Sequence, residues 1–178
     1  MTGILRFVGV ANAGVWLGGS IFYTVAVAPT MGSADMVGLL GTKNFPYFSG
    51  AISQLMLASY FHLQLACATV ALLHLLVEWL YLGRALWRFW TYLLVILFWL
   101  AVIGSFLLAP KLRELQRAQF VLDAKPVQRE AAAKSFHVWH GVSQSLNVLL
   151  IAGVGLYFWR AVHPPDELRF VGSPKIRG

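Results

Sequence analysis

The sequence predicts an all-α integral membrane protein, a four-helix bundle with an extended helical loop between its third and fourth spans. Of its 178 residues, 58% are hydrophobic and only 12% are charged, whereas soluble domains carry about 25% charged residues. Mean hydropathy is +0.68. Four apolar segments are long enough to cross a bilayer, at about residues 4–28, 52–82, 86–109 and 136–160. Residues 1–178 are therefore expected to form a single transmembrane domain.

The net charge of +7 does not indicate nucleic acid binding, because the basic residues lie between and beyond the apolar segments. The expected partner is the lipid bilayer of a plasma or inner membrane. Basic residues divide evenly between the two sides, so charge alone leaves the orientation open. We expect both termini in the cytoplasm, because Arg84, Arg88 and Arg160 lie close to span ends and short loops weigh most in the positive-inside rule.

The first span is expected to end at Pro29, because proline cannot extend a helix without losing a hydrogen bond. Asn12 and Trp16 share one of its faces, which we expect to point inward. Gly14 and Gly18 have the G-x-x-x-G spacing that lets two membrane helices approach closely. This spacing suggests a homo-oligomer or a subunit of a larger membrane complex.

Residues 30–50 contain several glycines and the aromatic sequence Asn44-Phe-Pro-Tyr-Phe48, which predicts a short interfacial connection. In the second span His74 and Glu78 are four residues apart, so they are expected to form an interfacial polar pair. Pro110 is expected to end or kink the third span.

The charged stretch after the third span has helical composition at residues 111–120 and 126–135, with Pro126 at a position typical of a helix start. If the second run joins the last span, a single helix over residues 126–160 would be about 50 Å long. It would extend beyond the membrane.

The last apolar segment carries an unusual number of polar side chains. His137, His140, Gln144 and Asn147 fall within a sector of roughly 80° on a helix, with Ser143 just outside it. Lipid does not solvate such groups, so this stripe is expected to face the bundle interior. The predicted buried polar residues are Asn12, Trp16, Ser143, Gln144 and Asn147.

His62 and His140 begin spans on the same side of the membrane and are expected at comparable depth. If both face inward, they are the minimum needed to ligate a b-type haem, or part of a copper or zinc site. The alternative is that each imidazole bonds a neighbouring polar group. No cluster of residues predicts a metal site, and the sequence has no nucleophile elbow, H-E-x-x-H or phosphate-loop motif. We therefore expect no enzymatic activity.

The chain resembles the small four-span proteins related to transmembrane protein 205. The resemblance rests on residues 15–19 followed by Ala28-Pro29, on residues 44–48 and on residues 136–147. In that family the last helix carries an H-G-x-S-x-x-x-N pattern, here His140, Gly141, Ser143 and Asn147. The W-x-G-G turn is also similar to copper-resistance D-type membrane proteins, although the first span here has no histidine. The first resemblance implies a four-span architecture and leaves the biochemical role open.

These observations favour a structural or accessory membrane bundle with a buried polar stripe and no cofactor. Two alternatives remain open at this point. One is a haem- or metal-binding electron-transfer subunit that uses His62 and His140. The other is a small-molecule or ion permease, for which the polar stripe is the supporting feature.

Overall fold

The computed structural model describes residues 2–82, 88–121 and 125–163, and this part of the chain is helical with short connections. The first rod is α1 (Thr2–Phe22), a π-helical turn (Tyr23–Val27) and α2 (Ala28–Thr30). A short α3 (Ala34–Leu40) precedes the long α4 (Phe45–Leu82). The third rod is α5 (Arg88–Ile103), a second π-helical turn (Gly104–Leu108) and α6 (Ala109–Ala118), and the fourth is α7 (Pro126–Val162).

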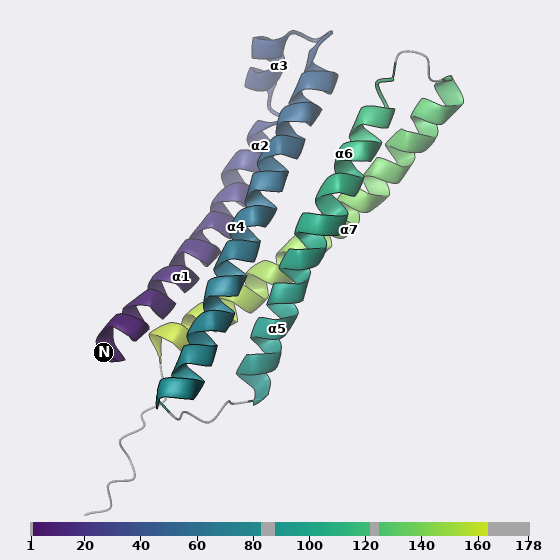
Figure 1. Ribbon diagram of the computed structural model, residues 1–178. Coiled ribbons are helices and arrows are strands. Elements are labelled where there is room, and N and C mark those ends of the chain that lie inside the picture. The colour runs from purple at the N-terminus through teal and green to yellow at the C-terminus, as the bar shows by residue number, and fades with distance from the viewer. Residues whose placement is uncertain (1, 83–87, 122–124, 164–178) are drawn as a thin grey trace, which may run out of the picture.

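Four of these rods are long and apolar enough to cross a membrane, which confirms the predicted fold class. They are Gly3–Thr30, Phe45–Tyr81, Arg88–Ala118 and Pro126–Val162. The first rod packs against α4 and α7, and the third rod packs against the same two helices, so α4 and α7 occupy opposite corners of the bundle (Figure 1). The start of α1 and the end of α7 lie at the same end, where Arg6 Nη2 donates to the Val162 carbonyl at 3.4 Å.

Each of two prolines follows a π-helical turn. Pro29 stands two residues after the turn Tyr23–Val27, and Pro110 two residues after the turn Gly104–Leu108. A proline inside a helix removes one backbone donor and crowds the carbonyl four residues earlier, and a π turn opens the helix at that place. The first rod ends soon after Pro29, as predicted. The helix of the third rod does not end at Pro110, because it continues to Ala118.

The connection after the first span differs from its prediction. Most of it is helical, because Ser33 caps α3 by accepting from Met36 N at 3.2 Å. The aromatic stretch that begins at Phe45 forms the first turn of α4 instead of a separate interfacial segment before it. Pro46 is tolerated there, since the first turn of a helix has no intrahelical partner for its missing donor. Gly41 ends α3 with a φ of 73°, which glycine adopts without strain.

The fourth rod begins at Pro126, as predicted. The Lys125 backbone donates to Gln128 Oε1 at 3.1 Å, which satisfies one donor at the helix start. From Pro126 to Val162 the helix has 37 residues, or about 55 Å at 1.5 Å per residue. Its first turns run beside α6 (Figure 1).

The core has two parts. The larger includes Trp16, Ala68, Leu97, Ala101 and Val154 and joins all four rods. The smaller cluster, towards the α6 end, is formed by Leu57, Tyr60, Phe61, Leu108, Ala109 and Leu112.

Gly104 and Phe61 show how closely the backbones of α4 and the third rod approach. A Cβ at Gly104 would overlap the Phe61 ring, and Phe61 is itself 6% exposed, so the ring has little room to move. Ser105 Oγ donates to the Phe61 carbonyl at 3.0 Å at the same level. The glycine therefore sets the distance between the two helices.

We expect Gly104→Ala to lower the free energy of unfolding by about 1–3 kcal/mol, the usual cost of overpacking a core. The measurement is the midpoint of thermal unfolding in detergent. Gly155→Ala is the matched control, because nothing lies within 4 Å of a Cβ at Gly155, and it should be neutral or stabilising. Equal midpoints for the two variants would show that Phe61 does not constrain this contact.

Candidate functional site

The most polar part of the interior is a ring of hydrogen bonds between α1 and α4. Trp16 Nε1 donates to Gln64 Oε1. Gln64 Nε2 donates to Ser20 Oγ at 2.8 Å, and the Ser20 hydroxyl donates to the Trp16 carbonyl at 2.6 Å. All three side chains are 0% exposed. Because Trp16 and Ser20 are one turn apart on α1, a single glutamine on α4 can bond both.

A second string of bonds links this ring to α7. Thr24 Oγ1 donates to the Ser20 carbonyl at 2.8 Å and accepts from Asn147 Nδ2 at 2.8 Å. The Tyr60 hydroxyl donates to Asn147 Oδ1, and the Tyr60 ring stacks on Tyr23 with centroids 4.2 Å apart. Tyr60 and Asn147 belong to α4 and α7, which are diagonal in the bundle. The network therefore crosses the interior and fixes three helices at one level.

The seam between α1 and α4 has further polar contacts nearer the termini. Asn12 Nδ2 donates to the Cys67 carbonyl at 3.0 Å. The His74 Nε2 atom lies 2.7 Å from the Leu5 carbonyl and donates to it. The sequence predicted that His74 pairs with Glu78. The Nε2 atom of its imidazole bonds the α1 backbone instead. These contacts hold antiparallel helices in register along their length.

Of the predicted buried polar residues, four lie on inward faces and one does not. Trp16 and Ser143 are buried, and Asn12 and Asn147 are half-buried. Gln144 is exposed on the outer surface of α7, so its predicted burial is wrong. The packed face of α7 instead contains Ser143, Leu150, Gly153, Val154 and Tyr157.

The reason for this correction is the direction of the α7 core face. The centre of that face lies roughly 100° round the helix from the centre of the stripe formed by His137, His140, Gln144 and Asn147. Only Asn147, at the edge of the stripe, reaches the interior. The larger apolar residues of α7 determine which side of the helix packs against the bundle. His137 and His140 therefore lie on the exposed side.

The expectation that His62 and His140 face inward is also wrong. Both are exposed on the outer surface, on the diagonal helices α4 and α7. The His140 ring stacks on Phe136 of its own helix, with centroids 5.6 Å apart. Within the described residues no group of three or more His, Cys, Asp or Glu side chains is arranged to hold a metal ion. The structure thus brings no pair of these histidines together inside the bundle.

The network includes four residues that were not among the predicted site residues: Ser20, Thr24, Tyr60 and Gln64. One signal in the sequence pointed to Gln64. It shares a helix face with Cys67, Ala68 and Ala71, which are 5%, 1% and 1% exposed. Small residues at such spacing mark the closely packed face of a membrane helix.

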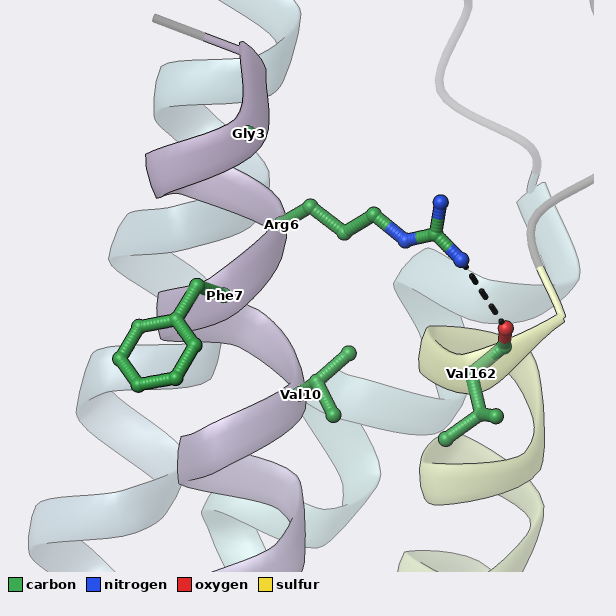
Figure 2. A pocket seen from close by; sticks show the side chains of 5 residues that line it. All are labelled: Gly3, Arg6, Phe7, Val10 and Val162. Atoms are coloured by element: carbon green, nitrogen blue, oxygen red, sulfur yellow. Dashed lines mark hydrogen bonds between the residues drawn. The ribbon is translucent and has the colours of Figure 1, made fainter.

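A shallow groove of about 350 Å³ lies at the terminal end of the bundle, between α1 and the last turn of α7. Its lining is Gly3, Arg6, Phe7, Val10 and Val162. Figure 2 shows the Arg6 side chain reaching across to the Val162 carbonyl. A cation is favourable at a helix C-terminus, where the backbone carbonyls lack partners. Arg6 thus has a structural role in joining α1 to α7.

We expect Gln64→Leu to be strongly destabilising, because it leaves Trp16 Nε1 without its acceptor and removes a donor from Ser20. An unsatisfied buried polar group costs about 1–3 kcal/mol. Gln144→Leu makes the same chemical change on an exposed surface and should leave the midpoint of thermal unfolding nearly unchanged. If both variants unfold at the wild-type temperature, the ring of hydrogen bonds does not stabilise the bundle.

The comparisons with known proteins identify a family and no biochemical activity. No curated protein and no solved structure matches the chain. The model of one family, the domain of unknown function DUF4149, matches residues 12–120. That region contains Trp16, Ser20, Thr24, Tyr60 and Gln64, whereas Asn147 lies outside it. The chain thus belongs to the DUF4149 family, a family of uncharacterised function.

Proposed function

We propose that this protein is a non-enzymatic component of a plasma or inner membrane, a structural or accessory bundle that works without a cofactor. The observation that carries the proposal is the network from Trp16 to Asn147. Its polar groups bond one another across three helices, and Trp16, Ser20 and Gln64 are each 0% exposed. Groups that bind a substrate need unused donors or acceptors that face a space, whereas these are directed at each other.

The alternatives gain less support. A haem or metal site that uses His62 and His140 within one chain would require both helices to rotate, because the two side chains are exposed at opposite corners. A permease would need water along the polar groups of the interior. The closed ring of Trp16, Gln64 and Ser20 occupies that position in this conformation.

The pattern residues that carry the resemblance to proteins related to transmembrane protein 205 divide between the two surfaces of α7. Of the four pattern residues in the last helix, Ser143 and Asn147 lie on or beside the packed face, and His140 and Gly141 are exposed. We assign the first two to holding the bundle together and leave the other two for contacts outside it. We further propose that both termini lie in the cytoplasm, with α3 on the opposite side of the membrane.

A double-mutant cycle tests whether the network is structural. Tyr60→Phe and Asn147→Leu each remove one member of the bond across the bundle, and their effects on the free energy of unfolding should be coupled by about 0.6 kcal/mol, a typical value inside membranes. The control pairs Tyr60→Phe with Ser145→Ala. Ser145 bonds the Gly141 carbonyl of its own helix, so that pair should be additive. Absence of coupling in the first pair would contradict a structural network.

The transport alternative needs a separate measurement. We expect liposomes that contain the purified protein to release trapped protons, potassium and small fluorescent solutes no faster than liposomes of lipid alone. The physical reason is that the polar groups of the network bond each other. Two observations together would replace the structural proposal with transport. The wild-type protein would have to release solute, and Gln64→Leu or Asn147→Leu, at equal folded amount, would have to alter that release.

A further inference from the structure

His62 lies deep in the apolar layer while facing away from the bundle. Phe61, its neighbour on α4, is level with Ser105, whose hydroxyl bonds the Phe61 carbonyl. The next charged residue towards the end of α6 is Lys111, six residues beyond Ser105 and thus about 9 Å away along the helix axis. Towards the other end, the nearest charge on that rod is Arg88, about 25 Å away. The imidazole is therefore distant from both aqueous levels.

Lipid leaves such a group without partners. In the described part of the chain, neither the His62 ring nor the hydroxyl of Ser59, one turn away, makes a hydrogen bond, and both residues are exposed. An unpaired polar group in a hydrocarbon environment is costly, and ionisable residues within membrane helices ordinarily face a protein partner. The exposed face of α4 at this level is therefore suited to a partner with polar groups.

The exposed face forms a continuous seam along α4. Its residues are spaced alternately by four and three and are all exposed: Leu55, Ser59, His62, Ala66, Thr69, Leu73, Leu76 and Leu80. This spacing keeps one line of contact along two helices that cross at about 20°. Ser59 and Ala66 are small enough for close approach of the backbones at the level of His62.

We propose that this α4 seam, defined by the eight residues above, binds the same seam of a second copy of the chain about a two-fold axis normal to the membrane. Copies inserted in the same orientation place each residue opposite its own counterpart at equal depth. A neutral imidazole has one donor and one acceptor, and a serine hydroxyl has both, so His62 and Ser59 are each complementary to themselves. A lysine or a glutamate at these positions would not be complementary to its own counterpart, because the two side chains would carry the same charge.

The outward polar residues of α7 have less need of a protein partner. Asn147 is level with Tyr60 through their hydrogen bond, and Gln144 is one turn nearer the membrane surface, about 5 Å. The Gln144 side chain is long enough to extend towards the aqueous level, as other long polar side chains do near span ends. His62 is too deep to do so. The inference goes beyond the proposed function and does not depend on the internal network.

Single cysteines test which face is shared. The background is Cys67→Ala, since Cys67 is the single cysteine of the chain and contributes its backbone carbonyl, not its thiol, to the bond with Asn12. Treated with copper phenanthroline and oxygen as the oxidant, Ser59→Cys and Ala66→Cys in native membranes should form a disulfide-linked dimer of twice the 19.7 kDa chain mass, because disulfides need Cα atoms within about 7 Å. Gln144→Cys, equally exposed but on α7, should remain monomeric. A dimer through position 144 alone, or through none of the three, would overturn the proposal.

A histidine pair provides the second measurement. His62→Leu and His140→Leu both replace an exposed imidazole by a side chain that lipid accepts, so both variants should fold. Energy transfer between labelled copies in liposomes, measured over a range of protein-to-lipid ratios, should show about threefold weaker association for His62→Leu, the loss expected for one hydrogen-bonded pair inside a membrane. His140→Leu should associate as the wild type does. Equal association of His62→Leu and wild-type protein would refute a contact through His62.

Discussion

The hydrogen bonds of Gln64 to Trp16 and Ser20 are the interactions on which the middle of the bundle depends. The bilayer offers no donor or acceptor to these groups, so a buried amide on α4 is stable only while α1 presents an indole N–H and a hydroxyl at its level. This requirement fixes the rotation of both helices and their relative height. Because Thr24 and Asn147 continue the same network, the position of α7 is tied to that of α1 as well.

The two π-helical turns serve the same packing. Each precedes an Ala-Pro pair, and each lets a helix tolerate a proline without breaking. In the third rod the turn also brings Gly104 and Ser105 against Phe61, where an added Cβ would not fit and where a hydroxyl bonds an α4 carbonyl. The irregularity in the backbone therefore lies at a close contact between α4 and the third rod.

The polar groups fall into two sets, an internal network whose members bond one another and an exposed set on α4 within its apolar length. In the network, the side chains of Gln64, Thr24 and Asn147 bond groups on neighbouring helices, whereas the buried Gln54 Oε1 on α4 has no partner in the described chain. Outside, His62 and Ser59 lie on α4 without partners in the described chain. The network groups therefore stabilise the bundle, and the exposed pair on α4 does not contribute bonds to it.

Two kinds of information decided this structure. Composition and the length of apolar segments determined the class, the four spans, the helix start at Pro126 and the inward position of Trp16, because lipid constrains backbone and side chains regardless of the partners that a helix has. Which side of α7 faces inward was decided by tertiary packing. The stripe of His137, His140 and Gln144 was a regular pattern in the sequence, yet Leu150, Val154 and Tyr157 fill the core and turn that stripe outward. Periodicity identifies the faces of a helix, whereas the fit of large side chains against neighbouring helices selects the one that is buried, and that fit depends on residues distant in the chain.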